Sequence, residues 1–228
     1  MFEWITENSF FCVFLTLGCF ELARAIQRKG KSTLLNPILV GSILVCAVLK
    51  LTGMEVKDYQ ADCAPLQFFL TPATICFSIG LFEQIEKLKK HLPAITIGVF
   101  CGTLVSLISI RSMARVFKLD YVLTVSLLPK SITTAIGMVL SQEAGGVAAL
   151  TTAAIIITGI LGNILGPFFC KYFRITEPIA QGAAFGTASH AIGTSKANEI
   201  SELTGAVSSL SLTLAGLITV ALFSFFTT

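Results

Sequence analysis

Charged residues are scarce in this sequence: Asp, Glu, Lys and Arg together make up 13% of the 228 residues. A soluble domain usually has about a quarter of its residues charged, because its surface must be solvated. Hydrophobic residues make up 54% of the chain, more than a soluble core of this length can bury. The composition therefore excludes an ordinary soluble domain and predicts an integral membrane protein. The formal net charge of +3 gives no indication of nucleic-acid binding.

Motifs for catalysis and metal binding are also missing. The sequence contains no G-x-S-x-G, H-E-x-x-H, phosphate-loop or paired-carboxylate motif. Ser189 and His190 are not a nucleophile–base pair, since neighbouring helix residues point about 100° apart. Of the seven cysteines no two form a C-x-x-C pair, and all but Cys63 lie inside apolar runs, where cysteine acts as a small hydrophobe. We expect no enzyme, no catalytic residue, no metal and no cofactor.

The chain contains eight apolar segments close to the length of a membrane span. A bilayer core about 30 Å thick needs a helix of about 20 apolar residues. The first residues lack the basic region of a signal peptide, so the first segment is expected to remain as a helix. We predict a single all-α transmembrane domain over residues 1–228, with about eight transmembrane or re-entrant helices. The segments are approximately residues 9–26, 34–51, 63–82, 92–110, 120–141, 146–170, 178–197 and 203–226.

Four of these segments contain residues that interrupt a helix. Proline removes a helix hydrogen bond, and unwound backbone at membrane depth survives only where protein or water satisfies it. In segment six, Gly159, Gly162 and Gly166-Pro167 favour close helix packing. The other three interruptions also carry polar residues, which close packing does not explain. They are Thr71-Pro72-Ala73-Thr74 in segment three, Pro129-Lys130-Ser131 in segment five, and Ser189-His190 between Gly186 and Gly193 in segment seven.

Basic residues between the segments indicate two halves of opposite orientation. The positive-inside rule places the cations of residues 24–31 and 87–90 in the cytoplasm. The cations of residues 111–118 then fall outside, although the second half prefers them inside together with Lys171 and Arg174. A re-entrant element in the first half resolves this conflict. We therefore predict inverted repeats, about residues 1–115 and 116–228, whose broken helices cross near the midplane, an arrangement typical of transporters.

Lys130 is a cation in the middle of segment five. A charged side chain at the bilayer centre costs about 2.5–3.5 kcal/mol on insertion scales. Snorkelling to the surface is the alternative, but both segment ends are distant, so we expect a buried functional cation. The hydroxyls of Ser131, Thr133 and Thr134 follow it, and they either coordinate an anion or bond to helix carbonyls.

His190 lies where glycines allow the chain to unwind, beside Ser189, Gly193 and Thr194. The ring either makes an interhelical hydrogen bond or, because histidine titrates near neutral pH, carries a coupling proton. Half-helix N-termini attract anions. Together with Lys130, these features predict a small electropositive site for an anion.

Three stretches of the sequence resemble the LrgB/CidB family of bacterial membrane proteins, which is also similar to the plastid glycolate/glycerate translocator. The resemblance covers nearly the whole chain. Thr71, Phe82 and Ala135 depart from the family's usual Gly, Tyr and Pro. The stretches are Leu70-Thr71-Pro72-Ala73-Thr74 with Gly80-Leu81-Phe82; Pro129-Lys130-Ser131-Ile132-Thr133-Thr134 with Gly145-Gly146 and Gly159-Ile160-Leu161-Gly162; and Ala188-Ser189-His190-Ala191-Ile192-Gly193-Thr194 with Gly205-Ala206.

The resemblance implies two functions. One is carrier-mediated transport of small monocarboxylates such as glycolate, glycerate or pyruvate, and the other is a holin- or antiholin-like role that tunes murein hydrolase activity and lysis. The predicted anion site favours the transporter, with a proton or sodium as coupling ion; the holin-like protein is the alternative, and a non-transporting scaffold comes third. The candidate substrate-binding residues are Pro72, Ala73, Thr74, Lys130, Ser131, Thr133, Thr134, Ser189, His190, Gly193 and Thr194.

The resemblance also implies a setting and partners. We expect a multi-pass protein of the bacterial cell (inner) membrane that binds a small organic anion and no nucleic acid. A homo-oligomer and a small LrgA/CidA-like membrane partner are the expected assemblies.

Overall fold

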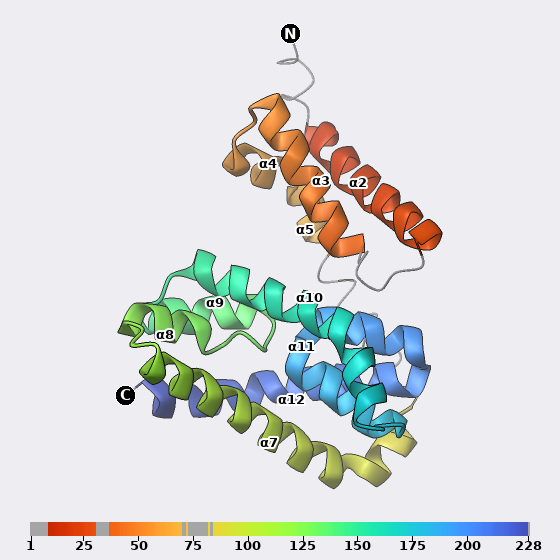
Figure 1. Cartoon of the computed structure of the whole chain (residues 1–228), viewed down its shortest axis with the longest axis vertical. Helices are drawn as coiled ribbons and strands as arrows, with labels where there is room; N and C mark the ends of the chain where they lie inside the picture. The colour runs from red at the N-terminus through yellow and green to blue at the C-terminus, as the bar shows by residue number, and fades with distance from the viewer. Residues whose placement is uncertain (1–8, 31–36, 70–71, 73–81, 83, 228) are drawn as a thin grey trace. The chain divides into compact units, whose positions relative to one another are not determined.

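A computed structural model describes residues 9–30, 37–69, 72, 82 and 84–227 of the chain (Figure 1). All regular elements in these residues are helices, which confirms the predicted all-α class. The chain divides into two compact units, Met1–Cys76 and Phe77–Thr228, and each is described by itself. Among the described residues, four helices are long and apolar enough to cross a membrane, or five if the bent pair α3–α4 counts as one span.

The first unit contains α2 (Ser9–Gly30), α3 (Pro37–Thr52), α4 (Val56–Asp62) and α5 (Ala64–Phe68). The long helices α2 and α3 pack together, and Gly41 of α3 allows the backbone of α2 to approach closely. The chain turns by 117° between α3 and α4. The Thr16 hydroxyl of α2 lies 2.7 Å from the Tyr59 hydroxyl of α4, so a polar contact fixes this turn.

The second unit contains three helices of full membrane length. They are α7 (Ile85–Val116), α10 (Ala148–Tyr172) and α12 (Glu202–Thr227). Pro93 in α7 and Pro167 in α10 both lie within continuous helices. Segment six is therefore uninterrupted, and the interpretation of its glycines as a packing face is the correct one.

Segment five is not a single span, contrary to the sequence-based expectation. It consists of α8 (Tyr121–Leu127) and α9 (Thr134–Glu143), about 10 Å and 15 Å long at 1.5 Å per residue. The two helices are antiparallel: a Cβ added at Gly137 would lie 3.3 Å from the Pro129 carbonyl, and one added at Gly146 would lie 2.9 Å from the Ser126 hydroxyl. Pro129 stops α8, and the chain folds back through residues 128–133 as a helical hairpin (Figure 1).

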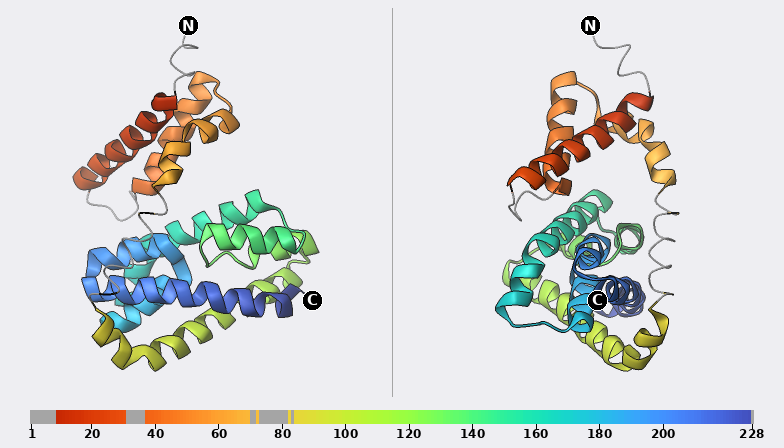
Figure 2. Two further views of the ribbon diagram at one scale, coloured as in Figure 1. Left: turned by 180° about the vertical axis from the view of Figure 1, so that it is seen from behind. Right: turned by 90° about the vertical axis from the view of Figure 1, so that its right-hand side faces the viewer.

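Helix α11 (Pro178–Ile200) is a second hairpin. Its backbone leaves the helical region at His190, with φ 43° and ψ −138°, which confirms the predicted break at Ser189-His190. A Cβ added at Gly193 would lie 2.6 Å from the Phe185 carbonyl, whereas residues eight apart in a straight helix are separated by about 12 Å. The arms of residues 178–189 and 191–200 therefore fold against each other (Figure 2).

The two hairpins begin at opposite ends of the unit. Leu128 of the α8–α9 hairpin packs with Leu107 near the end of α7 and Phe223 near the end of α12. Ile179 of α11 instead packs against the cluster of Leu88 and Ile95 near the start of α7, which also contains Ala206 near the start of α12. Each hairpin returns to the end where it began, and the tips of the two hairpins point toward the middle of the unit.

This arrangement corrects the predicted orientation of the second half. Lys171 and Arg174 were expected on the same side as the cations of residues 111–118, but α10 separates the two groups because both hairpins return. The end with the α10 C-terminus is called the lysine-rich end here, and it carries Lys89, Lys90, Lys171, Arg174 and Lys196. Arg111, Arg115 and Lys118 lie at the opposite end. The inverted repeat of residues 1–115 and 116–228 stays a prediction, and most of its break in segment three lies outside the described residues.

Candidate functional site

The tip of the α8–α9 hairpin presents Lys130 inside the second unit. Pro129 is fully buried and has no N–H to donate, and α8 ends at Leu127, two residues before it. The Lys130 ammonium donates a hydrogen bond to the Ser131 hydroxyl at 3.1 Å. The Ser131 hydroxyl in turn lies 3.1 Å from the Ser106 hydroxyl of α7. The ion pairs found among the described residues are Arg24–Glu21 and Lys196–Glu199, so no carboxylate there neutralises Lys130.

The tip of α11 is fixed against α10 by a buried imidazole. His190 is 4% exposed, and its Nε2 lies 2.9 Å from the carbonyl oxygen of Ile155. Because a carbonyl only accepts, Nε2 must carry the proton and donate it. A Cβ added at Gly159 would lie 2.8 Å from the ring atoms Cε1 and Nε2, so glycine is what lets this ring approach α10. His190 therefore has the interhelical role foreseen as one alternative; whether it also carries a proton stays a prediction.

Four other predicted residues lie within the hairpins, and two of them, Gly193 and Thr194, hold α11 in shape. The Thr194 hydroxyl donates to the His190 carbonyl at 3.0 Å and lies 2.8 Å from the Ser208 hydroxyl of α12. Gly193 allows the second arm of α11 to approach the first. Thr133 is the N-cap of α9 and Thr134 its first residue, without a side-chain capping bond. None of these four residues lines the two grooves described below.

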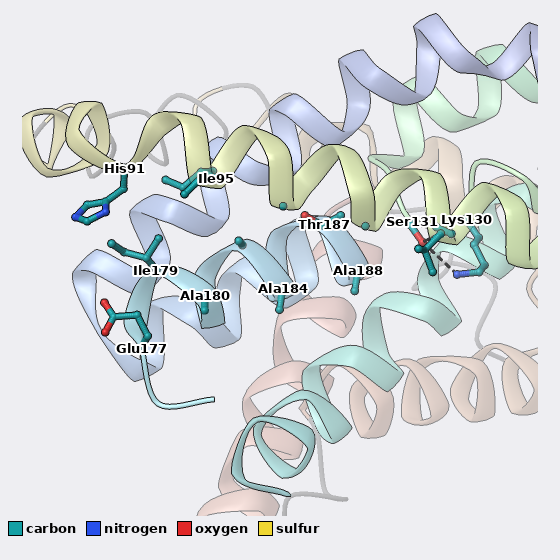
Figure 3. Close-up of a pocket in the computed structure, with 16 residues that line it drawn as sticks. His91, Ile95, Lys130, Ser131, Glu177, Ile179, Ala180, Ala184, Thr187 and Ala188 are labelled. Atoms are coloured by element: carbon teal, nitrogen blue, oxygen red, sulfur yellow. Dashed lines mark hydrogen bonds between the residues drawn. The ribbon is translucent and has the colours of Figure 1, made fainter. Parts of the chain in front are cut away.

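A groove of about 780 Å³ runs between α7 and the first arm of α11. Figure 3 shows it extending from His91 and Glu177 at one end to Lys130 and Ser131 at the other. Its walls consist mainly of small residues at intervals of four, since a helix presents every fourth residue on nearly the same face. These residues are Ala94, Gly98 and Gly102 on α7, and Ala180, Ala184 and Ala188 on α11.

A second groove of about 350 Å³ runs between α10 and the same arm of α11. It is lined by Lys130, Ser189 and Gly162, among others, and Gly162 is in direct contact with the Ser189 side chain. Lys130 lines both grooves and so lies at their junction. Of the predicted residues, the structure thus brings Lys130, Ser131 and Ser189 together, with His190 next to them.

Two threonine hydroxyls near the junction are buried without a partner. Thr103 on α7 and Thr187 on α11 are 4% and 8% exposed, and neither hydroxyl oxygen has a hydrogen bond within the described part of the chain. Both line a small cavity of about 10 Å³ with Ser106 and Ser131, and Thr187 also lines the larger groove. A buried hydroxyl without a partner costs about 1–3 kcal/mol, so this position suits a polar atom of a ligand or a water.

The remaining predicted residues are in segment three. Pro72 is exposed and belongs to the first unit. Ala73 and Thr74 lie outside the described residues, so their proposed role stays a prediction. The groove residues that sequence reasoning missed are His91, Glu177 and Ser106. The four-residue spacing of small residues on α7 and α11 is the signal that points to this groove.

Comparison with known proteins gives consistent matches over almost the whole chain. A family model described as the LrgB-like family matches residues 16–228. An antiholin-like protein LrgB of Bacillus mycoides (strain KBAB4) is 32% identical over 222 residues, covering 97% of this chain and 96% of the relative. Proteins of the same name from Bacillus cereus (strain B4264) and Bacillus anthracis (strain CDC 684 / NRRL 3495) are 33% identical with the same coverage. No solved structure matches the chain.

Proposed function

The chain belongs to the LrgB-like family, and on this premise we propose that it carries small monocarboxylates across the bacterial inner membrane. The observation that carries the proposal is the position of Lys130. It lies where two grooves meet, and among the described residues its ammonium has the Ser131 hydroxyl as its hydrogen-bond partner. A small organic anion would complete the charge balance there.

The surroundings of Lys130 suit a carboxylate better than a neutral solute. A partly buried ammonium without a counter-charge is unfavourable, and a charge-assisted hydrogen bond to a carboxylate offsets that cost. The hydroxyls of Ser106, Ser131 and Thr187 supply further donors for the carboxylate or for a hydroxyl on its α-carbon. Apart from Lys130, the basic residue that lines this groove is His91 at its other end, so no second cation lies beside Lys130 in the groove lining. This favours monoanions of the glycolate, glycerate and pyruvate class.

The test is flux into liposomes that contain the purified protein. We expect saturable uptake of radiolabelled glycolate that unlabelled two- and three-carbon monocarboxylates inhibit and dicarboxylates do not. A proton or sodium gradient, imposed separately, would identify the coupling ion. Uptake that is not saturable, and that extends equally to sugars and cations, would replace the carrier by a pore.

A second function is an antiholin-like role in murein hydrolase activity and lysis. The names of the relatives favour this role more than they favour transport. It would involve a small membrane partner of the LrgA/CidA kind. The discriminating experiment is zymography of secreted murein hydrolases in a bacterium that lacks its own copy. A wild-type chain that alters hydrolase activity without any carboxylate flux would favour this second role.

A further inference from the structure

One end of the larger groove lies at His91 near the start of α7 and at Glu177 before α11, both at the lysine-rich end of the second unit, where Glu177 is exposed (Figure 3). Toward the opposite end, beyond Lys130, Leu107 and Leu128 are 1% exposed and pack with Phe223. An anion can therefore reach Lys130 from the lysine-rich end, while a packed apolar layer blocks the other direction.

The lysine-rich end has the charge expected of a cytoplasmic face. It carries Lys89, Lys90, Lys171, Arg174 and Lys196, against Arg111, Arg115 and Lys118 at the opposite end. Cations near the ends of membrane helices are retained in the cytoplasm, and acidic residues contribute little to this rule.

We propose that the groove between α7 and α11 is an aqueous route by which an anion reaches Lys130 from the cytoplasm. The nature of that anion rests on the proposed function; the route and its direction rest on the groove, the packed apolar layer and the distribution of cations. Ala180, Ala184 and Ala188 line the groove on one face of α11, along the path between its mouth and Lys130. The conformation described is thus open toward the cytoplasm.

The experiment uses single cysteines in the full-length chain with its native cysteines replaced. Ala180→Cys and Ala184→Cys place a thiol in the groove, and Ile97→Cys, next to Gly98 but 65% exposed and outside the groove, is the matched control. The probe is an anionic, membrane-impermeant sulfonated methanethiosulfonate, which reacts with thiolates in water. It is applied to inside-out and to right-side-out membrane vesicles.

We expect both groove cysteines to react at least about tenfold faster in inside-out vesicles, while Ile97→Cys reacts in neither, because a thiol facing lipid does not ionise. When Lys130→Ala is added, the cysteine of Ala184→Cys should react about tenfold more slowly with the anionic reagent. Its rate of reaction with a cationic trimethylammonium reagent should not fall. Faster labelling in right-side-out vesicles, or no labelling of either groove cysteine, would overturn the route.

The labelling result is independent of transport. Labelling as expected, in a protein that moves no carboxylate, would support the route while refuting the proposed carrier function. Carboxylate flux in a protein whose groove cysteines are not labelled would refute the route but leave the proposed carrier function standing.

Discussion

Replacing Gly159 by alanine tests the contact that holds the α11 tip against α10. The new Cβ would lie 2.8 Å from two ring atoms of His190 and 2.8 Å from Cδ1 of Ile192, closer than carbon atoms pack. Overpacking of this kind costs about 1–3 kcal/mol. If the ring moves away, its hydrogen bond to Ile155 is lost in a buried site, at a further cost of about 1–3 kcal/mol. The better helix propensity of alanine opposes these costs by about 1 kcal/mol.

The expected net loss for Gly159→Ala is therefore about 1–5 kcal/mol in the free energy of unfolding. This corresponds to a fall of about 2–20 °C in the midpoint of thermal unfolding for a chain of this size. The assay is thermal aggregation of the detergent-purified protein, followed by size-exclusion chromatography. Gly98→Ala is the matched control, because an added Cβ meets nothing within 4 Å and should leave the midpoint unchanged or slightly raised. If both variants unfold at the wild-type temperature, the close approach of His190 to α10 is not real.

Four further predictions follow from the site and the ends of the helices. His190→Gln keeps a donor for the Ile155 carbonyl, so we expect normal insertion but a flattened pH dependence of carboxylate uptake; an unchanged profile would leave the ring a purely structural role. Thr187→Val removes a hydroxyl that has no protein partner, so stability should hold while the KM for glycolate rises about tenfold, and equal KM values would exclude this hydroxyl from binding. Lys130→Arg should impair uptake, because a guanidinium fork does not replace a compact ammonium, and wild-type uptake would argue against a specific ammonium contact. Lys29→Cys, at the end of α2, should react with an impermeant thiol reagent in inside-out vesicles only, since its neighbourhood is cationic, and labelling from outside intact cells would reverse that assignment.

The break in segment seven was predictable because two signals coincide in it. Gly186 and Gly193 flank Ser189-His190, so the chain combines permissive backbone with polar side chains that a lipid-facing helix would avoid. In segment six the helix continues through Gly166-Pro167. Its glycines serve close packing there, and the nearby Asn163 amide donates to the Ile192 carbonyl of α11 at 2.9 Å.

The fold of segment five could not be read from the sequence. A run of about 20 apolar residues satisfies the length of one span, and the same run also satisfies two half-length helices that fold back. What separates the two cases is tertiary: Pro129 lies beside Gly137, and the Ser126 hydroxyl accepts the Val147 N–H at 2.8 Å. The orientation predicted for the second half from the positive-inside rule was wrong for the same reason. The rule was applied as if each segment crossed the membrane once.

The groove residues were missed for a different reason. His91 and Glu177 lie near helix starts, where polar residues are ordinary, and alanines at positions 180, 184 and 188 carry no chemistry of their own. Their meaning comes from the pairing of α7 with the first arm of α11, which only the folded chain supplies. Lys130 was predicted correctly because a cation inside an apolar membrane segment is costly whether the segment spans the bilayer or folds back as a hairpin.

The central claim is that Lys130 binds the carboxylate of the substrate, and one comparison tests it directly. Lys130→Ala and Lys196→Ala each remove one lysine, but Lys196 is paired with Glu199 at 2.7 Å and lines neither groove. Glycolate uptake should be measured in liposomes that contain equal amounts of each folded variant. The account predicts that Lys130→Ala abolishes saturable uptake while Lys196→Ala retains it. Uptake by Lys130→Ala at the wild-type rate would contradict the anion site at Lys130.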